Sequence, residues 1–308
     1  MQVPAELVAD SGAAAVEPEF FRSDVFLAAE GVTHSLVVGG GRLVVPLIRR
    51  EIRDGLFDAI SPYGYPGGAF RDAPVPVSEI DFSGTGLVSI FLRDRLGAPA
   101  ISGGDERGDV LLHRPDVPRS VQRRVATKAR SNERAGYRFE ALPAKAVDDG
   151  LVDAFAAAYT ETMDAASASD RYYYGADYLR ACLLGDSSWL AAVRGPAGDL
   201  AAGAIVVLSD GYLHYYLGGT ADAHRSRSPA KNMMIGMIEL ADELGVPLNL
   251  GGGMRHGDSL HTFKASFTNA ASPYVTHSIV CDVEAYAALA GDADGAGFFP
   301  AYRAPRAR

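Results

Sequence analysis

Two short apolar runs separated by three glycines form the clearest pattern in the sequence. The runs HSLVV (34–38) and LVVPLI (43–48) are rich in β-branched residues, and glycines 39–41 lie between them. Glycine tolerates the positive φ that a tight turn between antiparallel strands requires, so this pattern predicts a β-hairpin. Further apolar runs predict strands at 56–60, 86–93 and 109–113. The first third of the chain is therefore predicted to be mainly sheet.

From residue 118 onward the apolar spacing becomes that of amphipathic helices. Leu151, Phe155 and Tyr159, for example, recur every four residues and share one helical face. Helices are predicted at 119–134, 147–164, 178–184 and 231–244, in addition to a short one at 19–30. Strands are predicted at 137–142, 188–193, 200–208, 212–218, 247–250 and 274–282. The three strands between 188 and 218 have only short turns between them, which indicates an antiparallel meander.

This mixture of strands and helices predicts an α/β fold in two domains. At 308 residues the chain is long enough for two hydrophobic cores. We place the first domain at 18–145 and the second at 146–285, each a mixed, largely antiparallel sheet flanked by helices. The segments 1–17 and 286–308 are expected to be irregular tails.

Composition narrows the classes of function. No apolar run reaches the roughly 18 residues that a membrane helix needs, and the first residues lack a basic stretch followed by an apolar one. The two cysteines, Cys182 and Cys281, suit neither a disulfide framework nor a metal site. We therefore expect a cytoplasmic protein without a bound metal. A net charge of −9 argues against non-specific binding along nucleic acid, because that binding needs surplus lysine and arginine.

One segment nevertheless concentrates positive charge. Residues 119–134 carry six basic side chains and one acidic residue, Glu133. A solvated helix face would explain this pattern, and so would contact with RNA or another phosphate-bearing partner. The candidate RNA contacts are Arg119, Arg123, Arg124 and Lys128.

Lys264 is one of only four lysines and lies between Phe263 and Phe267. Such a lysine often lays its stem on apolar neighbours and reaches water with its charged end. Alternatively, its fixed positive charge can stabilise an oxyanion that develops during acyl transfer. The residues alone favour the first reading.

Other catalytic patterns are missing from the sequence. It contains no Gly-x-Ser-x-Gly elbow, and no histidine pair with helical metal-ligand spacing. Glycines 251–253 are not followed by Gly-Lys-Ser/Thr, which argues against a nucleotide P-loop. Tyrosines cluster at 172–174 and 215–216, where they either pack in the core or line a polar pocket.

Several segments, in order, resemble the FemAB-type branch of the GNAT superfamily. They are ISPYGYPGG, RRVATKARSNERAGYRFEAL, FAAAYTETMDAASASDRYYYGADYL, LHYYLGGT, SPAKN, LNLGGG and DSLHTFKASF, within residues 57–267. The resemblance implies two GNAT-like domains that transfer an amino acid from aminoacyl-tRNA to an amine, with no further cofactor. It implies that Lys264 is catalytic. Substrate contacts are then expected at Tyr63, Tyr65, Tyr173, Tyr216, Asn232 and Phe263.

The sequence also departs from that branch. It has no heptad run for a coiled-coil arm, and Asp164 follows the Thr-Met pair where many members have arginine. These departures favour a small peptide-like acceptor, as in antibiotic assembly, over a peptidoglycan precursor. An acyl-CoA-dependent N-acyltransferase is an alternative, although the stretch HRSRSPA (224–230) lacks the glycines of a pyrophosphate loop. A non-catalytic binding protein of the same fold is another. We expect a monomer.

Overall fold

The computed structural model describes residues 2–10, 12–14, 19–252, 257–291 and 297–304. Its contacts divide the chain into unit 1 (1–17, 21–107 and 273–308) and unit 2 (18–20 and 108–272). Apart from the short stretch 18–20, the chain crosses between them within strands β10 (Asp105–His113) and β16 (Ala270–Val280). This division differs from the expected boundary at 145/146. The segment just before that boundary packs with later elements, since strand β11 pairs with β12 and helix α2 contacts α5.

Unit 1 is built on a sheet with the strand order β16-β8-β4-β3-β2-β1-β7. The predicted hairpin is confirmed, because β2 (His34–Val38) pairs antiparallel with β3 (Leu43–Arg53). All three glycines of its turn have positive φ. The remaining elements are β1 (Val3–Val8), α1 (Asp24–Ala29), β4 (Leu56–Ile60), β5 (Ala69–Phe70), β6 (Val75–Pro76), β7 (Ile80–Asp81), β8 (Ser89–Arg93), β9 (Ile101–Ser102) and α7 (Val283–Ala290).

The expectation of irregular tails was wrong at both ends. Near the start, β1 pairs with β2 and with β7, so its backbone groups are satisfied inside a sheet. Near the end, α7 begins after Asp282, whose side chain accepts a hydrogen bond from the Ala285 N–H and caps the helix. Further on, the Arg303 guanidinium pairs with the buried Asp58 carboxylate, which fastens this segment to the sheet of unit 1.

Unit 2 contains the sheet β11-β12-β13-β14-β15-β10. The predicted meander is confirmed, since β12, β13 and β14 pair antiparallel in sequence order. In contrast, β14 and β15 run parallel, with helix α5 between them along the chain. The strands are β11 (Arg138–Pro143), β12 (Ser188–Arg194), β13 (Leu200–Ser209), β14 (Tyr212–Thr220) and β15 (Leu248–Asn249).

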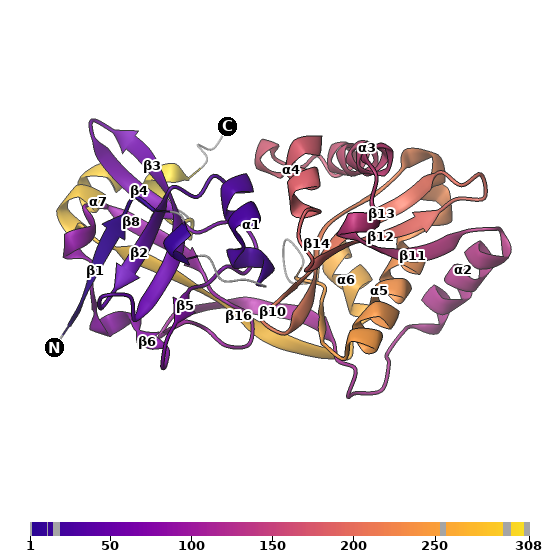
Figure 1. Cartoon of the computed structure of the whole chain (residues 1–308), viewed down its shortest axis with the longest axis horizontal. Helices are drawn as coiled ribbons and strands as arrows, with labels where there is room; N and C mark the ends of the chain where they lie inside the picture. Colours follow the sequence, from indigo (N-terminus) through magenta and orange to yellow (C-terminus); the bar gives the residue numbers. More distant parts are fainter. Residues whose placement is uncertain (1, 11, 15–18, 253–256, 292–296, 305–308) are drawn as a thin grey trace. The chain divides into compact units, whose positions relative to one another are not determined.

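Helices cover both faces of this second sheet. Figure 1 shows α3 (Asp149–Ala165) and α4 (Ala176–Cys182) on one face, and α5 (Ala230–Leu244) and α6 (Ser259–Ala265) on the other. Helix α2 (Arg123–Arg134) packs beside α5. The predicted helix at 119–134 therefore begins four residues later than expected, after the N-cap Gln122. The α/β fold class, a mixed sheet flanked by helices, is confirmed.

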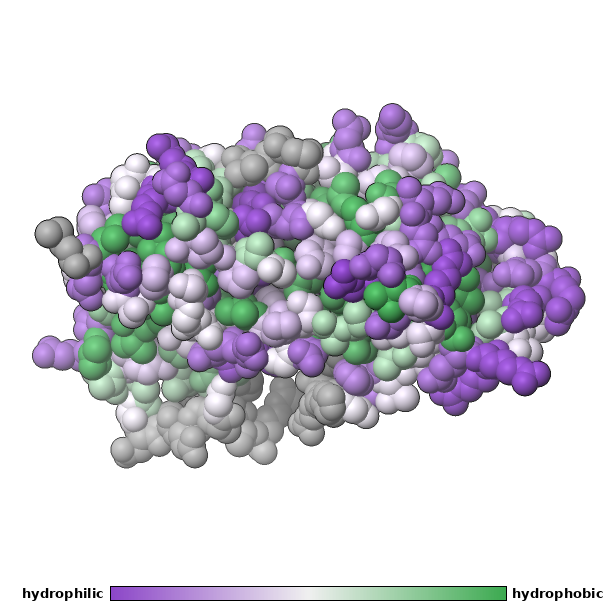
Figure 2. Space-filling view, turned by 90° about the horizontal axis from the view of Figure 1, so that it is seen from below, coloured by the Kyte–Doolittle hydropathy of each residue, from purple (hydrophilic) through white to green (hydrophobic). Residues whose placement is uncertain are grey.

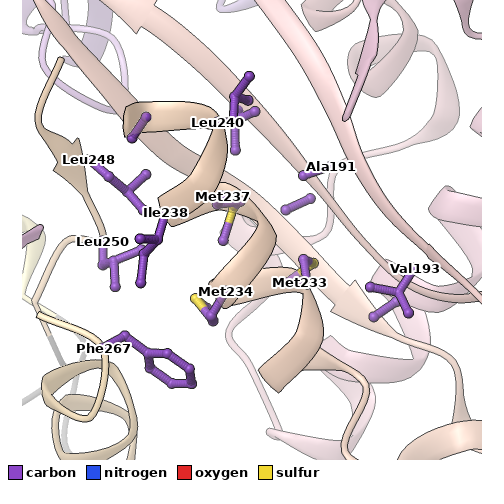
Figure 3. Packing of buried hydrophobic residues seen from close by; sticks show 14 of the residues in the cluster. Ala191, Val193, Met233, Met234, Met237, Ile238, Leu240, Leu248, Leu250 and Phe267 are labelled. Atoms are coloured by element: carbon purple, nitrogen blue, oxygen red, sulfur yellow. The ribbon is translucent and has the colours of Figure 1, made fainter. Parts of the chain in front are cut away.

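The core of unit 2 lies between α5 and the sheet. Met233, Met237 and Ile238 of α5 are almost fully buried in one cluster with Leu250 and Phe267, and Figure 3 shows Ile238 beside Leu250. Close packing of this kind fixes the angle of a helix on a sheet to within small tolerances. Because Phe267 follows α6 directly, the same core anchors α6.

Within the described part of the chain, no helix combines the length and the apolar character that crossing a bilayer requires.

Candidate functional site

The candidate site of unit 2 begins where two neighbouring strands part. Strand β15 pairs with β14 only at Leu213–Leu248 and His214–Asn249. The same two residues of β15 also pair with β10, and Leu250 continues on that side by donating its N–H to the Leu111 carbonyl. Past these two pairs, the described residues show no further strand pairing between β14 and β15.

A β-bulge in β14 follows shortly after the two residues that pair with β15. Tyr215 pairs with Val206 and Leu217 with Ile205, so that Tyr216 is the extra residue. Bulges re-aim the side chains of a strand. The Tyr216 hydroxyl lies 2.5 Å from that of Tyr178 on α4, whereas the Tyr215 ring faces Lys264 on α6. Tyr215 is therefore an aromatic neighbour of Lys264, and the predicted contact of Tyr216 with substrate stays a prediction.

Lys264 connects the two parting strands. Its ammonium donates a hydrogen bond of 2.9 Å to the Gly252 carbonyl, which follows β15, and it lies 5.6 Å from the centre of the Tyr215 ring on β14. A cation at that distance from an aromatic face is attracted by the ring. The residue is only 7% exposed, so the prediction from composition that it reaches into water was wrong.

Burial changes the acid–base behaviour of this lysine. It lowers the pKa of Lys264 to about 8, and the carboxylate of Asp258 opposes the shift. At pH 7 roughly nine-tenths of such a group is still protonated. The site therefore holds a poorly hydrated positive charge at neutral pH, which is the form that stabilises an oxyanion.

Helix α6 positions Lys264, and the sequence analysis missed this helix. Asp258 caps it by accepting a hydrogen bond of 2.7 Å from the His261 N–H. The rings of Phe263 and Phe267 pack edge to face with centroids 5.1 Å apart. Seven residues leave little helical periodicity to detect, although Asp258 was a recognisable capping signal. Of the predicted glycine run, Gly253 lies outside the described residues.

A pocket of about 500 Å³ opens next to α6. Positive charge reaches it from Arg124 of α2 and from Lys231 in the first turn of α5. Phe263 adds an aromatic side chain, so two predicted site residues, Phe263 and Arg124, border one cavity, whereas Lys264 is not among its lining residues. Its lining consists of Arg124, Val125, Lys231, Gly257, Ser259, Thr262, Phe263 and Ser266. Lys231 was not predicted as a site residue.

The predicted RNA contacts divide into two groups. Arg119 precedes α2 and forms an ion pair with Asp242 of α5, which favours a structural role. Arg123 and Arg124 are exposed in the first turn of α2, and Lys128 is half-buried one turn later. Hydrophilic side chains gather at this end of unit 2, on the right in Figure 2. The first turn of α2 is therefore the basic surface nearest the pocket.

Two further predicted substrate contacts of unit 2 lie elsewhere. Asn232 is buried, donates to the Ala129 carbonyl and accepts from the Asn132 amide, so both ends of its side chain connect α5 to α2. Tyr173 is 41% exposed and donates to the Asp164 carboxylate. These contacts favour a structural role for Asn232 and a surface position for Tyr173.

Tyr63 and Tyr65 belong to unit 1. The guanidinium of Arg93 lies 5.9 Å from the ring of Tyr63. Tyr65 packs edge to face against Tyr274 and Phe21, with centroid distances of 5.1 and 5.9 Å. Tyr65 thus belongs to an aromatic cluster of unit 1, and the predicted contact of both tyrosines with substrate stays a prediction.

A family model and several solved structures are similar to this chain. Residues 119–259 match a family model described as acetyltransferase (GNAT) domain, a range that includes the pocket up to Ser259. The crystal structure of FemX superposes with a TM-score of 0.62 at 12% identity, covering 90% of this chain and 96% of FemX. The chain has a GNAT-type fold. No curated protein sequence matches it significantly.

Two further structures share this GNAT-type fold. One is the C-terminal domain of a protein assigned as a lysylphosphatidylglycerol synthetase from Agrobacterium fabrum, with a TM-score of 0.58, 13% identity and coverage of 90% of this chain and 92% of that domain. The other is L-PGS from Bacillus licheniformis, with a TM-score of 0.57, 11% identity and coverage of 83% and 86%. At such low identity these likenesses establish the fold alone.

Proposed function

We propose that this GNAT-fold protein transfers an aminoacyl group from aminoacyl-tRNA to the amine of a small peptide-like acceptor. The observation that carries the proposal is the buried ammonium of Lys264 between the parting strands β14 and β15. A buried cation costs free energy unless something compensates, so its burial between these two strands points to chemistry that uses positive charge.

The proposed reaction is a direct displacement. The acceptor nitrogen attacks the ester carbonyl, the carbon–oxygen bond to the ribose breaks, and an amide forms. The proton lost by the amine is taken up by the departing ribose oxygen, directly or through water. Lys264 offsets the negative charge of the tetrahedral oxyanion. Holding donor and acceptor together supplies much of the remaining acceleration, so no covalent enzyme intermediate is required.

The pocket along α6 suits the donor end of a charged tRNA. Arg124 and Lys231 offer positive charge for phosphate, and Phe263 offers an aromatic surface against which a base can stack. Arg123 and Lys128 then extend the basic surface along α2. A peptidoglycan precursor as acceptor is a variant of the same proposal.

An acyl-CoA-dependent N-acyltransferase is the second candidate. It is favoured by the family model, whose description is acetyltransferase. The stretch before α5 argues against an acyl-CoA donor, since residues 221–229 contain no glycine. Even Ser228, which adopts a left-handed φ of 54°, is not a glycine. A phosphate cradle is usually made of glycines because they let the backbone approach the anion.

The test compares donors directly. Purified protein is incubated with a small-peptide acceptor set and either tRNA charged with radiolabelled amino acids or labelled acetyl-CoA, and amide product is counted. Each reaction is repeated after RNase treatment. Product from charged tRNA that disappears with RNase is the expected result. Product from acetyl-CoA that survives RNase would replace the proposal with the second candidate.

Variants connect the activity to the site. Lys264→Met keeps the length of the side chain but removes its charge, and loss of one oxyanion contact lowers kcat roughly 100- to 1,000-fold. Lys145→Met is the matched control, because Lys145 is an exposed lysine of the same unit. Unchanged turnover in Lys264→Met would remove Lys264 from the mechanism. Tight binding of charged tRNA without turnover in the wild type would favour a non-catalytic binding protein.

A further inference from the structure

We infer that His214 and Asn249 are positioning residues, which hold the Gly251–Gly252 turn so that the Gly252 carbonyl orients the Lys264 ammonium. The inference deepens the proposed function and rests on it for its catalytic meaning. It follows from an unbroken series of hydrogen bonds inside unit 2. Asn249 acts through the turn that it bonds, and His214 acts through Asn249.

The series begins at a buried histidine whose tautomer is fixed by its neighbours. The Nε2 of His214 lies 3.2 Å from the Ser209 carbonyl oxygen, and a carbonyl can only accept. Nε2 therefore carries the proton, and Nδ1 is an acceptor. Burial lowers the pKa of His214 to about 4, so the ring is neutral at physiological pH and this tautomer persists.

Asn249 links the histidine to the turn by hydrogen bonds at both ends of its amide. Its amide nitrogen lies 3.0 Å from His214 Nδ1 and must donate to it. The amide oxygen is thereby directed to the other side, where it accepts a hydrogen bond of 2.7 Å from the Gly251 N–H. Both neighbours demand the same orientation of the amide, so it cannot flip without losing both bonds. Asn249 is only 1% exposed, and water cannot easily replace either partner.

The turn also accepts a hydrogen bond from Lys264. Gly251 has a φ of +70°, which glycine adopts without strain, and its carbonyl accepts from the Leu111 N–H. With Gly251 held on both sides, the next carbonyl, that of Gly252, accepts the Lys264 ammonium at 2.9 Å. His214 and Asn249 are also the last paired residues before β14 and β15 part. The series thus fixes the geometry of the opening and the direction of its cation together.

The readout is the titration of Lys264 itself, which needs no substrate. The chain has four lysines, so protein labelled with ¹³C-lysine gives few side-chain signals, and Lys264→Met assigns the one of interest. Asn249→Leu removes both hydrogen bonds of the amide at similar volume. We expect the midpoint of the Lys264 titration to fall by about half a pH unit or more, since the carbonyl that accepts from the charged form is no longer fixed. His214→Phe, which keeps a ring but offers Asn249 no acceptor, should move it in the same direction.

Asn132→Leu is the matched control. Asn132 is also a buried amide of unit 2, but it bonds to Arg227 and Asn232, not to the turn. Its substitution should leave the Lys264 titration in place. An unchanged midpoint in folded Asn249→Leu, or an equal shift in Asn132→Leu, would overturn the inference. If Asn249→Leu does not fold, His214→Phe decides alone.

Activity measurements separate this inference from the proposed function. With charged tRNA as donor, Asn249→Leu should lower kcat about tenfold and leave the KM for tRNA unchanged, because the pocket residues are untouched. If no donor supports transfer by the wild type while the titration shifts as expected, the proposed function fails and the positioning stands. If transfer is observed but the titration does not move, the positioning fails alone.

Discussion

Replacing Lys264 by methionine should make the protein more stable and less active. The wild type holds a cation at a site that is only 7% exposed, and this is reflected in a pKa lowered from 10.5 to about 8. A folded state that depresses the pKa of a lysine binds fewer protons than the unfolded state, and it therefore loses stability whenever the lysine is protonated. Methionine fills the same space without charge.

The magnitude follows from the shift. A depression from 10.5 to about 8 corresponds to about 3 kcal/mol of destabilisation at pH 7. Methionine leaves the Gly252 carbonyl without its donor, which costs about 1 kcal/mol. The net gain in the free energy of unfolding should be about 2 kcal/mol at pH 7. It should shrink as the pH rises from 8 towards 10.5, because the wild-type lysine then becomes neutral in the folded state.

Urea denaturation of wild type, Lys264→Met and Lys145→Met at pH 7 and at pH 10 measures this difference. Lys145→Met should match the wild type at both pH values, because Lys145 is exposed. Transfer activity is measured on the same preparations. The reasoning is refuted if Lys264→Met is no more stable than the wild type at pH 7, or if its advantage is the same at both pH values. Either result would mean that the folded protein does not hold Lys264 as a strained cation.

Three other predictions test the surroundings of the site. Asp258→Asn keeps the cap of α6 but removes the charge that raises the pKa of Lys264. The alkaline fall in activity should therefore move to lower pH than in the wild type. An unchanged pH profile would show that the protonation of Lys264 does not limit the rate. Arg124→Ala should weaken tRNA binding and reduce the salt slope by about one, whereas Arg53→Ala on exposed unit 1 surface should not; equal effects in filter binding would place the RNA elsewhere. Tyr215→Leu should lower the pKa of Lys264 in the ¹³C titration, because the ring no longer stabilises the cation, and a rise would contradict the contact.

The sequence by itself determined the local elements and the unusual residue. Alternating apolar positions and the glycines of the 39–41 turn fix the first hairpin, since strand period and turn conformation are properties of short segments. The four-residue spacing of Leu151, Phe155 and Tyr159 fixes α3 in the same way. The rarity of lysine, together with the family resemblance, was enough to select Lys264.

The tertiary structure decided how those residues are used. Burial of Lys264 depends on the core that anchors α6, and its acceptor, the Gly252 carbonyl, is a backbone atom that no residue pattern identifies. The choice between Tyr215 and Tyr216 depends on a bulge, because one inserted residue exchanges the faces of a strand. Arg119 appeared equivalent to its basic neighbours until Asp242, more than a hundred positions away, was found beside it. Such long-range contacts arise from packing of whole elements, and local spacing carries no record of them.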